Sequence, residues 1–533
     1  MSEHPKNQQE QDKHAPEPGH TFNRRDILKG FFSLPVFGVF GLEFWRKLSH
    51  ERDKKTELLQ KLELSQQAPA LSTNMQSSSE HVRLGIVGFG ARGEYLARML
   101  GFAHPDWIAS QQQAENSDRL TDYLEQADLN VSLAGICDVF DMRAERGLQA
   151  AHNPNHASGK GATVKRYATY HNMVASPDID AVIVTTPDFH HAPVSIAAVD
   201  AGKHAYCEKG MTRTETEVYA VESAVKAAQK SKNIKFQVGH QYTQNPVFHK
   251  AREVLDKRLL GQITMVETFT NRNTPHGAWV RHLDGNGNPK PGSAESIDWQ
   301  EWLGEAPQVP FSLDRYYNWT KYWDYATGLS GQLMCHEYDA ANNLLDLGIP
   351  ASCVAAGGNY VFKDGREIPD IFQATFDFPE QEITMHYNAS LASSKKRDRT
   401  IVGRDGWMEV GNSLKVFPDG NSARYAEAIR QHVVDPGTPM FYFQPGSNQL
   451  DAITSATEKH YATSGLLYTY QAGQRVDVSH LHLREWLNAI RHDTALSCPI
   501  ERGFEVTIAC HMATKAYREN RRVTWNPMKR RIV

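Results

Sequence analysis

A glycine-rich turn between an apolar strand and a helix is the feature that most constrains what this chain can fold into. Residues 82–87 are apolar enough for a buried strand, and apolar side chains recur at helical spacing over residues 95–100. The first glycine of the turn allows a tight bend, the second lets a pyrophosphate approach the backbone, and the third lets the helix pack on the strand. Free N–H groups at the start of the helix can then hold phosphate charge. The residues expected to form this dinucleotide cradle are Gly88, Phe89, Gly90, Ala91, Arg92 and Gly93.

The second predicted strand ends in an acid, Asp138, which follows the apolar residues 133–137. Asp138 lies 50 residues after Gly88, whereas about 20 residues beyond the motif is usual. We interpret the polar segment 103–130 as an insertion that accounts for the excess. A carboxylate at this place hydrogen-bonds the ribose 2′-OH and repels a 2′-phosphate, which favours NAD over NADP. The alternative role for Asp138 is that of a helix cap or loop acid.

Two further apolar segments, residues 181–187 and 204–207, predict strands of the same sheet. We therefore expect an α/β fold that begins with a doubly wound parallel Rossmann sheet. Ligands of such sheets bind outside the carboxyl ends of the strands. The side chains expected to reach the cofactor from these ends are Thr186, Pro187, His191, Glu208 and Lys209. Residues 352–417 alternate apolar and polar in short runs, which predicts a second, mostly antiparallel sheet.

Several segments together resemble the Gfo/Idh/MocA family of nicotinamide-dependent oxidoreductases. They are GFGARG, VIVTTPDFHHAPVSIAAVDAGKHAYCEKG, QVGHQYTQNPVFHKAREVL, KYWDYATGLSGQLMCHEYDAANNLLDLG and LREWLNAIRHDTALSCPIERGFEVTIACHMATKAYREN, within residues 82–525. The resemblance implies a Rossmann domain followed by an α/β domain with a large open sheet. We place the first domain at residues 81–212 and the second at 213–533, with the C-terminal segment able to pack back on the first domain.

The family's catalytic motifs are matched in part. Its E-K-P lysine, which lies by the nicotinamide and the substrate hydroxyl, corresponds to Lys209, with Gly210 in place of proline. Its D-x-x-x-H motif corresponds to Gln332 and His336, so the histidine is present and the acid is not. An amide cannot accept a proton as a carboxylate does, which puts the family's usual proton relay in doubt; Glu337 and Asp339 are the alternative acids. The expected catalytic residues are Lys209 and His336, and the expected substrate contacts are His240, Tyr242, Arg272, Gln332 and Asp339.

Composition and cysteine spacing exclude other classes of site. Fifty-eight basic and 62 acidic residues leave a net charge of −4, which gives no electrostatic footprint for nucleic acid. The six cysteines include no C-x-x-C pair, and His480-Leu-His482 alternates as a strand would, so we expect no metal site. We expect the cysteines to be small buried side chains without a chemical role.

The N-terminus has the layout of an export signal. A polar stretch (residues 1–20) precedes Arg24-Arg25 and the apolar run 30–45, an order that resembles a bacterial twin-arginine signal. We therefore expect residues 1–45 to be a disordered tail with a signal or anchor, and residues 46–80 to be a tether. The expected location is the bacterial periplasm, reached through the twin-arginine machinery. Cleavage of the signal and anchoring to the inner membrane both remain open.

The resemblance and the export signal together define the expected function. We expect hydride transfer between a carbohydrate hydroxyl carbon and a tightly bound nicotinamide, because the periplasm offers no supply of free NAD. A branch of the family is a redox-neutral, NAD-dependent glycosidase that oxidises, eliminates and reduces, and Thr270-Asn271-Arg272 and the KYWDY run look similar to it. A catalytically silent binding protein is the second alternative. A homo-oligomer built on the open sheet is expected by analogy, whereas the sugar and the ring position attacked stay open.

Overall fold

The computed structural model describes residues 54, 56–64, 80–114, 118–281, 292–445, 468–471 and 474–533. The expected export signal lies outside this part of the chain, as does most of the tether. Within the described ranges, no helix has the length and apolar character needed to cross a bilayer.

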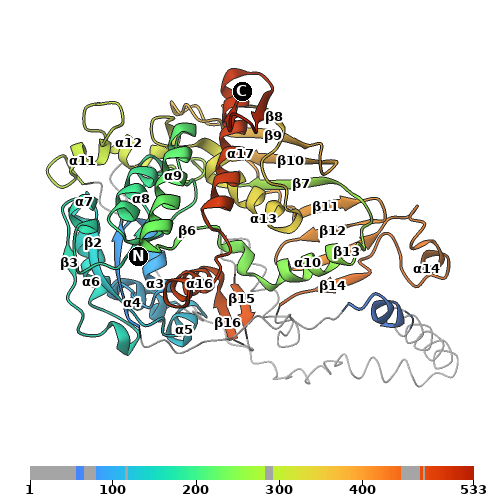
Figure 1. The fold of residues 1–533 in the computed structure, drawn as a ribbon, viewed down its shortest axis with the longest axis horizontal. Coiled ribbons are helices and arrows are strands. Elements are labelled where there is room, and N and C mark those ends of the chain that lie inside the picture. Colours follow the sequence, from blue (N-terminus) through green and yellow to red (C-terminus); the bar gives the residue numbers. More distant parts are fainter. Residues whose placement is uncertain are drawn as a thin grey trace, which may run out of the picture.

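The first domain is a six-stranded parallel sheet in the order β3-β2-β1-β4-β5-β6 (Figure 1). Its strands are β1 (Val82–Val87), β2 (Val131–Cys137), β3 (Lys165–Arg166), β4 (Ala181–Val184), β5 (His204–Cys207) and β6 (Phe236–Val238). All neighbours are parallel, and β2, β4 and β6 are buried along their whole length, as strands covered on both faces must be. The predicted Rossmann sheet is thus confirmed. The sheet also includes β6, which lies beyond the boundary at residue 212 drawn from the sequence.

Helices cover both faces of this sheet. One face packs against α3 (Ala91–Met99), α6 (Asp141–Ala151) and α16 (Val478–His492), and the other against α7 (Tyr170–Val174), α8 (His191–Asp200) and α9 (Glu215–Lys232). α16 comes from the C-terminal part of the chain, and its Trp486 is fully buried in the same cluster as Leu96 of α3. The polar insertion after α3 forms α4 (Pro105–Gln113) and α5 (Asp118–Glu125).

The second domain is a ten-stranded sheet in the order β14-β13-β12-β11-β7-β10-β9-β8-β17-β18. The strands are β7 (Ile263–Asn271), β8 (Ser352–Gly358), β9 (Ile371–Phe378), β10 (Ile383–Ser390), β11 (Arg399–Gly403), β12 (Gly406–Val410), β13 (Leu414–Pro418), β14 (Phe441–Phe443), β17 (Val523–Asn526) and β18 (Arg531–Ile532). Every neighbouring pair is antiparallel except β7 with β10, which confirms the second half of the fold prediction.

One face of the large sheet is covered by α10 (Pro246–Asp256), α13 (Cys335–Leu345) and α17 (Ile500–Glu519) (Figure 1). Side chains along β9, β10, β12 and β13 alternate between buried and part-exposed, as expected for a sheet with one covered face. Short elements complete the described fold: α14 (Ala426–Arg430) and the hairpin of β15 (Tyr468–Gln471) with β16 (Gln474–Asp477).

A segment of the second domain returns to the first domain and packs beside its sheet. This strap, residues 292–329, contains α11 (Trp299–Leu303) and α12 (Leu313–Tyr317). Its Ile297 bridges to Phe140, and its aromatic side chains form a separate apolar cluster with Phe140 and Phe189 of the first domain. The strap therefore closes one side of the space above the carboxyl ends of β2 and β4.

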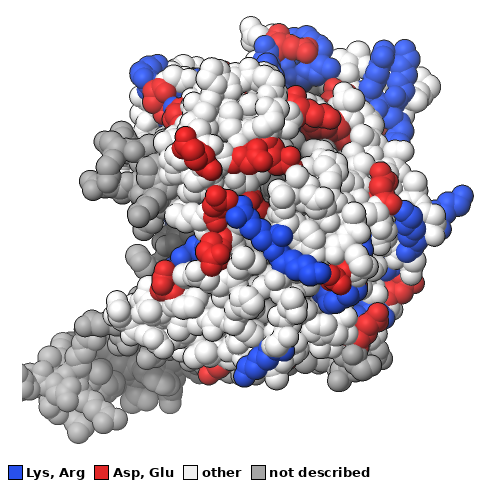
Figure 2. Space-filling model, turned by 90° about the vertical axis from the view of Figure 1, so that its left-hand side faces the viewer, with Lys and Arg blue, Asp and Glu red and all other residues white. Residues whose placement is uncertain are grey.

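Acidic and basic side chains are interspersed across the face of the molecule in Figure 2.

Candidate active site

A cleft of about 710 Å³ lies where the strap and the second domain meet the carboxyl ends of the parallel strands. From the first domain it is lined by Gly88, Gly90, Ala91, Arg92, Asp138, Thr186, Pro187, His191, Glu208 and Lys209. From the second domain it is lined by Tyr242, Arg272, Gln332 and His336, among others. Four expected site residues are not in its wall. These are Phe89 and Gly93 of the glycine turn, and His240 and Asp339 of the second domain.

The glycine turn is built as its spacing predicts. Gly88 has a φ of +87°, and a side chain there would meet the Thr185 carbonyl at 2.9 Å. A Cβ on Gly93 would come within 2.3 Å of the Gly88 oxygen, so only glycine lets the helix approach the strand. A Cβ on Gly90 would meet nothing closer than the Arg143 side chain, at 3.5 Å. The backbone at Gly90 is therefore open to the cleft, as a phosphate-binding turn requires.

Asp138 is buried at the end of β2, and backbone N–H groups hold both of its carboxylate oxygens. Oδ2 accepts from Phe89 N at 2.6 Å and Oδ1 from Phe140 N at 2.9 Å, which ties the acid to the glycine turn. Burial raises the pKa of Asp138, and the charge of Arg143 opposes that rise. Each oxygen keeps a second lone pair for a ribose hydroxyl. The Arg143 guanidinium lies 5.0 Å from the centre of the Tyr316 ring on the strap, an aromatic wall that the sequence pattern did not reveal.

Glu208 and Lys209 turn in different directions after β5. Glu208 is buried and accepts hydrogen bonds from Arg92 at 2.8 Å, which joins the end of β5 to the glycine turn. Lys209 Nζ donates to the backbone oxygen of Gln332 at 3.0 Å and to its side-chain oxygen at 3.3 Å. Gly210 follows with a φ of +66°, which proline cannot adopt. The departure from the family's E-K-P motif thus has a conformational cause.

Gln332 belongs to a π-helical turn, Ser330–Met334, that runs directly into α13. Its side-chain nitrogen donates to Asp188 Oδ2 at 2.5 Å. The same oxygen accepts from the N–H and the hydroxyl of Thr327, at 3.1 and 2.8 Å. Asp188 comes from the first domain, just after β4, so this carboxylate joins the two domains behind Lys209. Sequence reasoning missed Asp188, although its place at a strand end was a usable signal.

His336 lies in the cleft wall on the first turn of α13. Its ring stacks on Tyr242 with centroids 4.7 Å apart and meets the His240 ring edge-on at 5.6 Å. Burial holds the pKa of His336 well below its usual value, and the charges of Lys209 and Arg92 lower it further. The ring is therefore neutral at pH 7. Its Nδ1 is buried and has no hydrogen-bond partner among the described residues.

The alternative acids near His336 are committed to other partners. Asp339 accepts from Arg502 Nε at 2.7 Å, and Glu337 pairs with Arg399 at 3.0 Å. Neither contacts Lys209 in the structure. The acid that stands behind Gln332 is Asp188 instead.

His191 connects the turns that follow β4 and β5. Its two ring nitrogens lie 2.8 Å from the carbonyl oxygens of Gly210 and Thr186. It therefore holds the turns after β4 and β5 together. Thr186 also lines the cleft, and its buried hydroxyl has no partner among the described residues.

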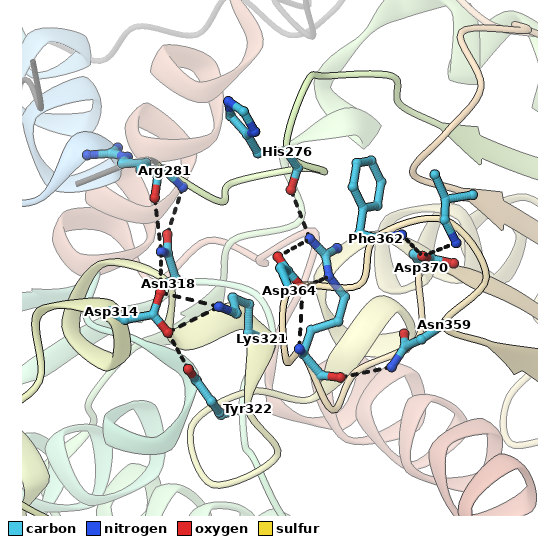
Figure 3. Close-up of polar contacts among 12 residues, drawn as sticks. His276, Arg281, Asp314, Asn318, Lys321, Tyr322, Asn359, Phe362, Asp364 and Asp370 are labelled. Atoms are coloured by element: carbon cyan, nitrogen blue, oxygen red, sulfur yellow. Dashed lines mark hydrogen bonds and ion pairs between the residues drawn. The ribbon is translucent and has the colours of Figure 1, made fainter. Parts of the chain in front are cut away.

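Part of the cleft wall is formed by the loop that follows β7, which contributes Arg272, Trp279 and Arg281. Arg272 lies 5.2 Å from the centre of the Trp279 ring, and Trp279 is 39% exposed with a φ of +64°. Figure 3 shows how the loop is held: the Asn318 amide binds the backbone N–H and oxygen of Arg281, and Arg366 donates to the His276 oxygen at 2.8 Å. The exposed Trp279 was not singled out from the sequence.

Asp370 and Lys321 extend this support on either side. Asp370 is fully buried and accepts three backbone N–H groups, from Tyr360, Val361 and Phe362, which fixes the loop that carries Arg366 (Figure 3). Lys321 pairs with Asp314 on the strap at 3.1 Å. Hydrogen bonds and an ion pair outside the cleft thus hold the loop that contributes Arg272, Trp279 and Arg281 to its wall.

The doubly wound sheet, the glycine turn and the interdomain cleft define a two-domain dinucleotide-binding protein. The chain belongs to the Gfo/Idh/MocA oxidoreductase family, whose NAD-binding Rossmann fold matches residues 82–240 and whose C-terminal alpha/beta domain matches residues 304–525. The resemblance inferred from the sequence motifs is thus confirmed, and so is the expectation that the first domain binds NAD.

Individual relatives match shorter stretches. A levoglucosan dehydrogenase from Pseudarthrobacter phenanthrenivorans is 36% identical over 94 residues, which are 18% of this chain and 23% of the relative. A glycosyl hydrolase family 109 protein from Shewanella baltica is 28% identical over 150 residues, 28% of this chain and 27% of the relative. The chain thus spans about a quarter of the length of each of these curated relatives.

Solved structures share the fold over a greater length. A levoglucosan dehydrogenase in complex with NADH and levoglucosan superposes with a TM-score of 0.54 at 17% identity. The superposition covers 84% of this chain and 99% of that structure. At this identity the likeness concerns the fold.

Proposed function

We propose that this protein is an NAD-dependent oxidoreductase that transfers hydride between a carbohydrate hydroxyl carbon and a tightly held nicotinamide. The observation that carries the proposal is the place of Lys209, which lies in the same cleft wall as the open turn at Gly90 and as His336. A relative named levoglucosan dehydrogenase supports a sugar as the substrate class. NADP is the less favoured cofactor because Asp138 stands at the end of β2.

The chain's own groups can perform the proton transfer. When bound, NAD supplies the hydride acceptor. The Lys209 amine donates to two acceptors on Gln332, so the third position on its nitrogen is available to a substrate hydroxyl. A lysine accepts a proton only through the lone pair of its neutral amine. His336 lines the same cleft, and its neutral ring can accept a hydrogen bond or proton from the same hydroxyl.

A redox-neutral glycosidase is the second candidate, and two observations favour it. The relative from Shewanella baltica is named a glycosyl hydrolase family 109 protein. Gln332 stands where the dehydrogenase pattern has an acid, so the site departs from plain alcohol oxidation. Oxidation of a ring hydroxyl would acidify the neighbouring C–H. Loss of that proton would expel the leaving group of the glycoside, water would add to the resulting double bond, and return of the hydride would reduce the carbonyl to the alcohol.

Two measurements separate these candidates and the silent binding protein. A denatured extract of purified protein is expected to contain NAD in about equimolar amount, and an empty extract with no binding of added NAD supports the binding protein. With bound cofactor, glycoside cleavage without lasting NADH supports the glycosidase. Lasting NADH from a free sugar without cleavage supports the dehydrogenase.

We also propose that the N-terminal segment is an export signal. Arg24-Arg25 and the apolar run after them support export through the twin-arginine machinery to the bacterial periplasm, either with cleavage or with anchoring at the inner membrane. Fusion of residues 1–80 to a fluorescent reporter is expected to place it in the periplasm. Replacement of both arginines by lysine is expected to keep the reporter in the cytoplasm, whereas unchanged placement would contradict the proposal.

We propose a homo-oligomer that forms through the face of the ten-stranded sheet that no helix among the described residues covers. Trp407 and Phe417 stack on this face with ring centroids 5.2 Å apart, opposite the face that the helices cover. Sedimentation analysis is expected to show a dimer or larger species. A monomer at micromolar concentration would remove the proposal.

A further inference from the structure

Asp188 is a buried carboxylate whose charge the mechanism above does not use. It is 2% exposed, and no cationic side chain pairs with it among the described residues. Its hydrogen-bond partners in the structure are the Thr327 N–H, the Thr327 hydroxyl and the Gln332 amide, all from the second domain. A buried charge without a counter-ion is costly unless such donors surround it.

The carboxylate decides which way the Gln332 amide points. An ionised carboxylate can only accept, so the amide nitrogen must face Asp188. The amide oxygen is then turned the other way, toward Lys209 Nζ, at 3.3 Å. The order is therefore Asp188, then the amide of Gln332, then the amine of Lys209, with every donor facing an acceptor.

The backbone reinforces this order. The π-helical turn places the Gln332 carbonyl 3.0 Å from the same amine, so one residue supplies both acceptors. A π turn within a helix often marks a functional site. A Cβ on Gly331 would lie 1.9 Å from the Thr327 hydroxyl, so the turn is packed tightly against the group that donates to Asp188.

We propose that Asp188 is a positioning residue for Lys209, acting through Gln332, and that it takes the place of the acid missing at position 332. The inference rests on the proposed function in that Lys209 is the base. A carboxylate in direct contact would hold the amine as an ammonium ion through a charge-assisted bond. The interposed amide fixes the position of the amine through an uncharged acceptor and keeps the negative charge one residue away.

The test reads the amine itself and needs neither sugar nor turnover. Full-length protein is treated briefly with acetic anhydride at pH 8, and peptide mass spectrometry measures acetylation of Lys209 against Lys226, an exposed lysine on α9 that serves as the internal reference. In Asp188→Leu no acceptor is left for the Gln332 amide nitrogen, so the amide can rotate and turn that nitrogen toward Lys209. Lys209 then loses its side-chain acceptor, and we expect its relative acetylation to rise at least threefold.

Asp188→Asn is the matched control, because its amide oxygen can occupy the position of Oδ2 and accept the same three hydrogen bonds. Acetylation of Lys209 in this variant is expected to stay close to the wild-type rate. Unchanged acetylation in Asp188→Leu, or an equal rise in Asp188→Asn, overturns the inference. If Asp188→Leu does not fold, Gln332→Met, which removes the same acceptor for Lys209, is expected to show the same rise, and no rise overturns the inference.

These outcomes are separable from failure of the proposed function. A variant series that behaves as expected in a protein inactive toward every sugar would leave the positioning role standing and remove the activity. Sugar turnover with acetylation insensitive to residue 188 would do the reverse.

Discussion

Lys209 is held by another residue's amide rather than by an acid, and this sets how the site can be tested. Replacement by alanine removes the amine without disturbing the glycine turn, which is formed by other residues. We expect Lys209→Ala to lower kcat by roughly 10²–10⁴-fold, the usual contribution of an acid–base group, while the NAD content of purified protein stays unchanged. Steady-state kinetics and extract analysis measure the two effects. Lys226→Ala on α9 is the control, and full activity in Lys209→Ala would remove the lysine from the mechanism.

Trp279 is predicted to bind substrate without taking part in chemistry. Its exposed ring in the cleft wall can stack on a sugar face, so Trp279→Ala is expected to raise KM by roughly tenfold, about 1.4 kcal/mol, and to leave kcat within a factor of two. Tyr442→Ala is the matched control because Tyr442 is an equally exposed aromatic side chain on β14, 41% exposed. A loss of kcat with unchanged KM would contradict this role.

Strand-end reasoning placed Asp138 and Lys209 correctly in the cleft wall, whereas it did not single out Asp188. Asp138 and Lys209 lie where strand-end reasoning put them, because parallel strands present their carboxyl ends at one edge. Asp188 follows a strand end too, yet its partner Gln332 is 144 residues away in sequence. Only the packing of the two domains brings such a pair together, so the spacing of residues could not reveal it.

Among the elements, the π-helical turn before α13 is the one that the site depends on most. A methyl group on Gly331 would clash with Thr327 at 1.9–2.4 Å, so Gly331→Ala must move Thr327 or unwind the turn. We expect a loss of unfolding free energy of about 1–3 kcal/mol, the range for overpacking, together with reduced activity. Urea unfolding and kinetics measure the two.

Gly420→Ala is the matched control for this variant. A Cβ at Gly420 meets only the Pro436 side chain, at 3.5 Å, so this substitution is expected to leave stability within about 0.5 kcal/mol. Equal stability of the two variants would show that the turn tolerates a side chain and that its packing is unimportant.

The strands could be predicted from the periodicity of apolar residues in the sequence, whereas the strap could not. Continuous apolar runs predict the buried strands of the first domain, and the alternation of apolar and polar residues predicts the strands within residues 352–417. The aromatic-rich stretch near residue 320 has no such period. Its side chains pack against Phe140 and Phe189 of the other domain, a long-range arrangement that a local pattern does not encode.

On the scale of the whole molecule, several histidines are buried in neutral form, and their burial makes the folded protein less stable in acid. Burial lowers the pKa of His190, His480 and His511 to about 4 in each case, with backbone hydrogen bonds opposing the shift at His190 and His480. The unfolded chain binds these protons near pH 6.5 and the folded chain does not, so stability is complete above about pH 6.5 and falls as the pH drops toward 4. Each histidine is expected to contribute about 3 kcal/mol to this loss.

Urea unfolding between pH 4.5 and 8 measures this dependence. His480→Gln, which keeps a donor for the Met99 oxygen, is expected to flatten the slope, whereas His171→Gln at an exposed position is expected to leave it unchanged. A pH-independent unfolding free energy across this range would contradict the neutral burial of these rings.

The most direct test of the whole account is the nicotinamide content of the purified, full-length protein. The account predicts close to one NAD per chain in a denatured extract, and loss of that NAD when Gly90 is replaced by leucine, whose side chain would fill the open approach to the turn. An empty extract from wild-type protein that also binds no added NAD by calorimetry would contradict the claim that this cleft holds a nicotinamide beside Lys209.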